Sequence, residues 1–399
     1  MRYSRVYISA LGYELPPVVV TSEELESRLG PVYDDLHIAP GQLEALTGIA
    51  ERRWWEEGYP LSAGAASAAR KALDRSQVRP EDIEVLIYAG VCRENFEPAT
   101  ACAVAKALSI GADAQIYDVS NACLGVLNGI IDIANRIELG QIRAGMVVSC
   151  ESAREIIEVV IERMLAERTI DTFKESIATL TGGSGAAAVL LTDGSFCRSS
   201  RRRLVGAATK AAPEHDQLCR WGVRLSPMAN ARLIFSPDKL LSAIDQLADP
   251  ETIPAWLKEL MTSDRLPPVL ARLLPSERLP AALTQFMATD SVAVLKHGVE
   301  LGVRTWGAFL HKLGWGRDQI DKVICHQVGS GHRDTILREL GIPPEKDYST
   351  YRYLGNIGTV SLPLTAALAD QRCFLQPGDH VGFLGIGSGL NCLMLGWEW

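Results

Sequence analysis

The chain carries one pattern twice: PEDIEVLIY occupies residues 80–88, and RDQIDKVICH occupies residues 317–326. In both copies a short acidic segment leads into a run of apolar, mostly branched residues, which is typical of a buried strand. A helical stretch precedes each copy. Ile83 aligns with Ile320 at a separation of 237 residues. We therefore interpret the chain as two copies of one α/β unit.

Strand-like and helix-like patterns alternate along most of the chain. Strands are predicted at residues 83–91, 115–119, 144–150, 186–192, 320–328 and 381–386, and helices at 63–72, 99–108, 124–139, 291–313 and 362–369. Nearly all-apolar strands joined by helices predict sheets that are covered on both faces. Two such units related by a pseudo-dyad would bring Cys123, His326 and Asn356 together.

Composition limits the class of protein. The 399 residues are 47% hydrophobic and 22% charged, with a net charge of −8, which argues against a general nucleic-acid binder. No apolar run approaches the ~18 residues of a membrane span, and the N-terminus lacks a secretory signal. Nine cysteines without paired spacing predict reduced thiols in a cytoplasmic protein and no metal site.

Residues 225–286 interrupt the repeat. They hold eight of the twenty prolines and none of the thirty-four glycines. Short amphipathic stretches between the prolines predict a helical insertion, because the segment is too apolar to be a disordered linker. We therefore divide the chain into halves at 1–195 and 196–399, the second interrupted by this insertion.

Cys123 is the strongest candidate nucleophile. It follows the predicted strand 115–119 and stands directly before a predicted helix, in the motif NACLG at residues 121–125. A helix N-terminus favours a thiolate, and its N–H groups can hold an oxyanion once that thiolate attacks a thioester. A buried structural cysteine is the alternative.

His326 and Asn356 are the candidate hydrogen-bond donors to a thioester carbonyl as it becomes an enolate. His326 ends an apolar strand, where sites of α/β proteins tend to lie, but a satisfied core histidine is the alternative. Asn356 lies between glycines in LGNIGT at residues 354–359, a pattern that a simple turn explains equally well.

A glycine-rich turn, GIGSG at residues 385–389, comes at the end of the last predicted strand, residues 381–386. Such a turn alone is a weak signal, since similar runs bind phosphate or only reverse the chain. The functional interpretation is that the backbone N–H of Ser388 points at the oxyanion formed on Cys123.

Together these motifs, with TGIAERR at residues 47–53, resemble the thiolase-superfamily condensing enzymes and more closely their ketoacyl synthase III branch. The resemblance covers the chain except residues 225–286. Within the branch, VCRENFEPAT at 91–100 and the terminal glycine turn are most similar to OleA-type enzymes, which join two fatty acyl-CoAs head to head.

The resemblance implies a five-layer α-β-α-β-α thiolase-like fold, a homodimer and no bound cofactor beyond acyl-CoA as substrate. It implies a non-decarboxylative Claisen condensation of two long-chain acyl-CoAs to a 2-alkyl-3-ketoacid, the first step towards long-chain olefins or ketones. Cys123 would carry the first acyl group, with its oxyanion held by the N–H groups of Cys123 and Ser388. His326 and Asn356 would stabilise the enolate of the second acyl-CoA.

The resemblance also gives Glu97 a role. In OleA-type enzymes a glutamate at this position reaches into the partner subunit's site, where it is proposed as the base. Decarboxylating ketosynthases need no such base, because loss of CO₂ creates the carbanion. The alternative is that Glu97, before Pro98, only complements the dipole of a following helix.

Four arginines, Arg198, Arg201, Arg202 and Arg203, form a basic run. A solvated loop is the commoner explanation for such a run, and CoA phosphates are the functional alternative. The insertion could cap the acyl channel, dock another pathway enzyme, lie on a membrane surface or serve only as packing.

Three other functions remain open. A ketoacyl synthase III that uses a malonyl thioester needs the same Cys123, His326 and Asn356 but not Glu97. A Cys-dependent acyl-CoA hydrolase would place water where the second substrate binds. A non-catalytic thiolase-fold partner would not need the Cys–His–Asn set, so the presence of that set argues against it.

Overall fold

The computed structural model describes residues 1–196, 202–225 and 283–399. By its internal contacts the chain divides into two units, Met1–Arg220 with Met287–Trp399, and Trp221–Phe286. The larger unit contains the predicted repeat and all the predicted catalytic residues. No helix within the described ranges is long and apolar enough to cross a membrane.

The first half of the larger unit forms five strands: β1 (Tyr7–Glu14), β4 (Val85–Ala89), β5 (Gln115–Val119), β6 (Ala144–Glu151) and β7 (Gly185–Thr192). Their order in the sheet is β5-β4-β6-β7-β1. Strand β4 is parallel to β5 and β6, whereas β7 is antiparallel to both β6 and β1.

The second half repeats this order as β11-β12-β13-β8. Its strands are β8 (Arg203–Ala211), β11 (Lys322–Cys325), β12 (His380–Gly387) and β13 (Asn391–Glu398). A single bridge between Val323 and Asp347 occupies the place that β5 has in the first half. The start of β4 and the start of β11 are 237 residues apart, as are the 3-10 turns before them, Pro80–Asp82 and Arg317–Gln319. The internal repeat predicted from the sequence is therefore confirmed.

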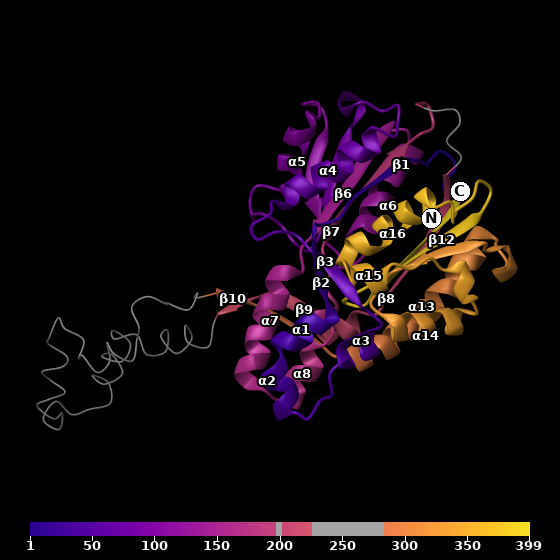
Figure 1. The fold of residues 1–399 in the computed structure, drawn as a ribbon. Coiled ribbons are helices and arrows are strands. Elements are labelled where there is room, and N and C mark those ends of the chain that lie inside the picture. The colour runs from indigo at the N-terminus through magenta and orange to yellow at the C-terminus, as the bar shows by residue number, and fades with distance from the viewer. Residues whose placement is uncertain (197–201, 226–282) are drawn as a thin grey trace, which may run out of the picture. The chain divides into compact units, whose positions relative to one another are not determined.

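Helices cover and separate these strands in layers (Figure 1). Helices α6 (Gly125–Glu138) and α16 (Ser361–Gln371) share one core cluster with strands of both halves. Helices α4 (Leu61–Leu73) and α5 (Thr100–Leu108) pack on the outer face of the first half. Helices α13 (Ser291–Leu313) and α14 (Ser330–Leu340) pack on the outer face of the second. The expected five-layer α-β-α-β-α fold is confirmed.

Helix α6 shows how the sequence places the central layer. Ile130, Ile133, Ala134 and Ile137 recur at the three- and four-residue spacing of one helix face, and all four are fully buried. They pack in the same cluster as Phe383 of β12 and strand residues of the first half. The N-terminal end of this helix, which follows Cys123, is thereby fixed between the two halves.

Further described elements lie outside the main sheet. They comprise β2 (Val18–Thr21), β3 (Glu51–Trp54), α1 (Ser22–Arg28), α2 (Gly30–Asp35), α3 (Gln42–Thr47), α7 (Arg154–Glu167), α8 (Ile170–Ser176) and α15 (Tyr351–Leu354). Single 3-10 turns lie at Thr179–Thr181, Pro213–Leu218, Pro344–Lys346 and Gly358–Val360. The apolar side chains of α1, α2, α7 and α8 form a cluster of their own.

Two strands, β9 (Cys219–Leu225) and β10 (Leu283–Thr289), pair with each other where the chain enters and leaves the predicted insertion. The helices expected between them fall on residues 226–282, outside the described residues. The predicted boundary at residues 195 and 196 falls between β7 and β8.

Candidate active site

Cys123 lies in a sharp turn between β5 and α6. Ala122, directly before it, has a φ of +43°, a left-handed conformation that few residues other than glycine adopt. The Leu124 N–H donates to the Asn121 carbonyl at 2.9 Å, and α6 begins at Gly125. The arrangement of strand, cysteine and helix predicted from the sequence is therefore present.

The terminal glycine turn lies beside this cysteine. A Cβ atom added to Gly387, the last residue of β12, would lie 3.4 Å from the backbone nitrogen of Cys123. Ser388 follows directly, and no described residue accepts a hydrogen bond from its N–H. The structure thus brings the Ser388 segment to Cys123 and leaves the donor expected in the oxyanion hole unpaired.

Asn356 is anchored by its backbone. Its N–H donates to the Thr181 carbonyl, and its own carbonyl accepts from the Gly183 N–H, both at 2.9 Å. The side-chain Oδ1 accepts from the Gly358 N–H at 3.0 Å, which is an Asx turn. Because Oδ1 is occupied within the turn, the Nδ2 group is the part of the amide that remains to donate to a ligand.

Asn356 is indeed a turn residue, as the alternative interpretation held, but the left-handed positions belong to its neighbours. Gly355 and Gly358 have φ values of +66° and +55°. One residue further on, the Thr359 hydroxyl accepts from the Val126 N–H in the first turn of α6 at 2.7 Å. The Asn356 segment is thus tied to the helix that follows Cys123.

His326 extends β11 by one residue, and its N–H donates to the Leu384 carbonyl of β12 at 2.8 Å. Cys325 of β11 pairs with Leu384 of β12, so His326 lies beside Gly385. Gly387 is two residues further along β12. Strand geometry places the Cα atoms of His326 and Gly387 roughly 8 Å apart. His326 therefore lies near the turn beside Cys123.

The His326 side chain is 5% exposed, and its Nδ1 is buried without a described hydrogen-bond partner. Burial, followed by the nearby His332, lowers the pKa of His326 to about 3. The imidazole is therefore neutral at pH 7 and can donate one hydrogen bond or accept a proton. Because Nδ1 has no partner among the described residues, the geometry favours a site histidine over a satisfied core histidine.

The expectation that the helix N-terminus favours a Cys123 thiolate is wrong for the free protein. Burial, followed by the neighbouring Cys219 and the Glu151 carboxylate, raises the pKa of the Cys123 thiol to about 12. Removing the thiol from water and placing it near Cys219 and the Glu151 carboxylate outweigh the backbone hydrogen bond that lowers this pKa. Cys123 is therefore a neutral thiol at pH 7 until substrate or a base removes its proton.

Glu97 is exposed, as are the residues from Arg93 to Pro98 around it. Phe96 beside it is 97% exposed. The hydrogen bonds that cap the next helix come from Asp118 and not from Glu97. The Asp118 carboxylate accepts from the N–H groups of Thr100 and Ala101, in the first turn of α5, at 2.9 Å each.

Two residues near the site were not identified from the sequence. Glu151 ends β6, and a Cβ atom at Gly358 would lie 3.7 Å from its Oε1. His332 lies in the first turn of α14, with a buried Nδ1 that has no described partner. Glu151 follows an apolar strand, the signal that singled out His326, whereas His332 has no comparable signal in the sequence.

The described arginines of the basic run are engaged within the chain. Arg202 pairs with Asp370 at 2.9 Å, and Arg203 pairs with Glu398 at 2.7 Å. Glu398 is seven residues along β13 from Asn391, which pairs with Gly387, a separation of about 23 Å. Arg198 and Arg201 lie outside the described residues. We therefore make no proposal for CoA phosphates on this run.

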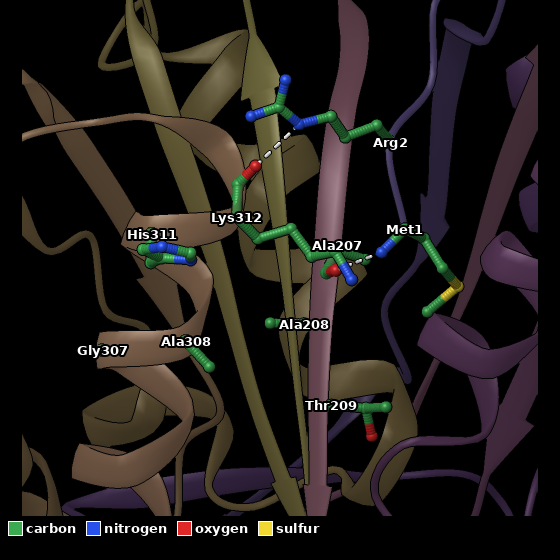
Figure 2. A pocket seen from close by; sticks show the side chains of 9 residues that line it. All are labelled: Met1, Arg2, Ala207, Ala208, Thr209, Gly307, Ala308, His311 and Lys312. Carbon is green, nitrogen blue, oxygen red and sulfur yellow. Dashed lines mark hydrogen bonds between the residues drawn. The ribbon is translucent and has the colours of Figure 1, made fainter.

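A pocket of about 830 Å³ lies elsewhere, between the N-terminal residues, β8 and α13. Figure 2 shows Arg2 and Lys312 among its lining residues, and the Arg2 Nε donates to the Lys312 carbonyl at 2.8 Å. Ala207, Ala308 and the larger His311 also line it. The pocket contains none of the predicted catalytic residues.

Known protein families match segments of both halves of the chain. Residues 61–181 match the thiolase N-terminal domain, and residues 310–399 match the C-terminal domain of 3-oxoacyl-[acyl-carrier-protein] synthase III. Over the full length of both proteins, the chain is 51% identical to an acyl-CoA:acyl-CoA alkyltransferase of Shewanella oneidensis. The chain belongs to the acyl-CoA:acyl-CoA alkyltransferase family.

Another family member, from Xanthomonas campestris, is 30% identical over the full length of both chains. A crystal structure of a cysteine-to-serine variant of Xanthomonas campestris OleA, with bound lauric acid and lauroyl-CoA, superposes with a TM-score of 0.81. It is 30% identical, and the match covers 100% of each chain. Membership of the alkyltransferase family makes this protein a thiolase-fold acyltransferase of the condensing type.

Proposed function

We propose that the enzyme joins two long-chain fatty acyl-CoAs by a non-decarboxylative Claisen condensation and releases a 2-alkyl-3-ketoacid. Its relatives carry the name acyl-CoA:acyl-CoA alkyltransferase, and one OleA structure holds lauroyl-CoA. The observation that carries the proposal is the exposure of Glu97, a carboxylate without a described partner in its own chain. A decarboxylating enzyme would have no use for such a base.

In the first step the Cys123 sulfur attacks the carbonyl carbon of one acyl-CoA. The carbon–sulfur bond to CoA breaks, and the proton of Cys123 leaves on the CoA thiol. The transient oxyanion accepts hydrogen bonds from the N–H groups of Cys123 and Ser388, where Gly387 lies beside the Cys123 backbone. The neutral thiol of the free enzyme limits wasteful reaction until an acyl-CoA is bound.

In the second step a second acyl-CoA places its carbonyl oxygen against His326 and the Nδ2 of Asn356. Both groups donate hydrogen bonds that strengthen as the oxygen becomes an enolate. The Glu97 carboxylate of the partner subunit takes the proton from the α-carbon. The carbanion attacks the acyl group on Cys123, the carbon–sulfur bond to Cys123 breaks, and the thiolate regains a proton.

Water then hydrolyses the remaining CoA thioester and releases the ketoacid. This scheme requires a homodimer, because Glu97 is exposed on its own chain and would act in the site of the partner subunit. The exposed loop of residues 93–98, with Phe96 at its tip, supports that assembly. The product is the starting compound for long-chain olefins or ketones.

Product analysis tests this function. Purified protein is incubated with myristoyl-CoA alone, and the products are identified by mass spectrometry. The proposal predicts a ketone of twenty-seven carbons, formed when the ketoacid loses CO₂. Myristic acid alone would favour a hydrolase. No turnover until malonyl-CoA or malonyl carrier protein is added would place the enzyme with the decarboxylating synthases.

A further inference from the structure

Glu151 is a buried carboxylate at the end of β6, with 4% of its surface exposed. Its Oε1 accepts from the Val91 N–H at 2.9 Å, and its Oε2 accepts from the Cys92 N–H at 3.1 Å. Burying a carboxylate is costly unless such bonds are made. Val91 and Cys92 begin the loop that carries Glu97, so Glu151 fixes the start of that loop.

The same carboxylate lies beside the Asn356 turn. A Cβ atom built on Gly358 would lie 3.7 Å from the Cγ, Cδ and Oε1 atoms of Glu151, so this side chain occupies the space next to that glycine. The N–H of Gly358 is the group that holds the Asn356 side chain. A shift of Glu151 would therefore change the packing beside the turn that holds this amide.

Further bonds keep Glu151 in place. Its carbonyl accepts from the indole Nε1 of Trp55 at 3.1 Å. The Tyr88 hydroxyl lies 2.7 Å from the Cys150 carbonyl and 2.8 Å from the Cys92 carbonyl. The end of β6 and the start of the loop are thus held as one rigid support.

Glu151 also acts on the nucleophile. Its negative charge is one cause of the raised pKa of Cys123, after burial and Cys219. It is thus linked to three parts of the proposed machinery: the nucleophile, the amide donor and the loop of the base.

We propose that Glu151 is a positioning residue for the condensation step, whose carboxylate holds the start of the Glu97 loop and the Asn356 turn in their working geometry. This inference rests on the proposed function. It separates the two half-reactions, because acylation of Cys123 uses neither Asn356 nor Glu97, whereas condensation uses both.

Glu151→Gln tests the inference with little change of shape. An amide has one acceptor oxygen, so its NH₂ group would face either the Val91 N–H or the Cys92 N–H, and one of these bonds is lost. We expect acylation of Cys123, followed by intact-protein mass spectrometry, to stay within about threefold of the unmodified enzyme. The ratio of condensation product to free fatty acid should fall at least about tenfold, since small misplacement of reacting groups is costly.

Two further variants serve as controls. Glu151→Asp keeps the charge and both acceptor oxygens, and should recover part of the product ratio. Glu155→Gln removes a nearby exposed carboxylate, which accepts from the Ser152 hydroxyl at 2.6 Å, and should leave the ratio unchanged. Thermal unfolding of each variant shows whether it folds.

A second readout does not depend on condensation. Removing the negative charge of Glu151 lowers the pKa of the Cys123 thiol, so alkylation of Cys123 by iodoacetamide at a fixed pH should be faster in Glu151→Gln. Cys219, the other group that raises this pKa, is unchanged in that variant.

The outcomes are distinct. If the unmodified enzyme makes no condensation product, the proposed function fails, whatever Glu151 does. If it does, and folded Glu151→Gln keeps the same product ratio, the inference about Glu151 is wrong. Equal loss of acylation and condensation in Glu151→Gln would also contradict it, because that pattern indicates general damage. A Glu151→Gln protein that does not fold leaves Glu151→Asp to decide, by whether its product ratio falls while acylation is kept.

Discussion

The backbone N–H of Val126 donates to the hydroxyl of Thr359 at 2.7 Å, across 233 residues of sequence. Val126 lies in the first turn of the helix after Cys123, and Thr359 lies three residues after Asn356. An N–H group in the first turn of a helix has no partner within the helix, so a side chain must supply one. This bond therefore aligns the nucleophile of one half with the donor of the other.

Thr359→Val should test that alignment. Valine matches threonine in shape but cannot accept a hydrogen bond, so a buried N–H is left unpaired. We expect the free energy of unfolding to fall by about 1 to 3 kcal/mol in urea titration. Condensation should also slow. Thr359→Ser keeps the hydroxyl, so its free energy of unfolding should fall much less. Equal falls in the two variants would show that the hydrogen bond is unimportant.

The protonation state of Cys123 predicts a pH profile. Because its thiol has a pKa raised to about 12, the thiolate fraction of the free enzyme should rise tenfold for each pH unit up to that value. Alkylation of Cys123 by iodoacetamide should therefore increase steadily from pH 7 to pH 10, after correction for the other cysteines with a Cys123→Ala control. A plateau near pH 7 would instead indicate a stabilised thiolate.

Mixed dimers can show where Glu97 acts. Glu97→Ala and Cys123→Ala should each lose condensation, and only Cys123→Ala should lose the acyl-enzyme. A dimer with one subunit of each kind would contain one complete site, with Cys123 from one subunit and Glu97 from the other. Co-purified mixed dimers should therefore recover up to about half of the activity expected for two intact sites.

The control is a dimer of unmodified protein with the double variant Glu97→Ala, Cys123→Ala. If Glu97 acts across the interface, that dimer has no complete site and should be inactive. Activity in this control, and none in the mixed single variants, would place Glu97 in the site of its own subunit.

Gly183 supports the Asn356 segment by close approach. A Cβ atom at this position would lie 1.9 Å from the Leu354 carbonyl oxygen. Because this oxygen belongs to the backbone, it cannot rotate away as a side-chain atom could. Gly183→Ala should lower the free energy of unfolding by about 3 kcal/mol or more, measured by urea titration. Gly307→Ala, in the middle of α13 with nothing within 4 Å, should instead stabilise by about 0.5 to 1 kcal/mol. Similar changes in the free energy of unfolding for Gly183→Ala and Gly307→Ala would contradict the packing described for Gly183.

Periodic apolar stretches were predictable from the sequence, and most other elements were not. The strand at residues 115–119 has the predicted bounds, and α13 spans the predicted residues 291–313. Strand β11 ends at Cys325 rather than at residue 328, because the chain turns there into α14. The short elements between residues 18 and 54 have too few residues to show a period.

Within the site, residue types at strand ends and in glycine turns identified Cys123, His326 and Asn356. Two physical effects were beyond that reasoning. The sequence shows a helix start after Cys123 but not the burial and the carboxylate that raise its pKa, since Glu151 comes from a different strand. Nor does it show that Asp118 caps α5, which leaves Glu97 exposed.

The proposed enzyme joins two acyl-CoAs on Cys123 without a malonyl donor. The most direct measurement of this reaction uses myristoyl-CoA carrying carbon-13 at its carbonyl carbon, with mass spectrometry of the ketone and of the released CO₂. Head-to-head condensation predicts one labelled carbon in each ketone, from the acyl group held on Cys123, and one in each CO₂, from the second acyl-CoA. Labelled myristic acid as the sole product, or a ketone formed equally by Cys123→Ala, would contradict it.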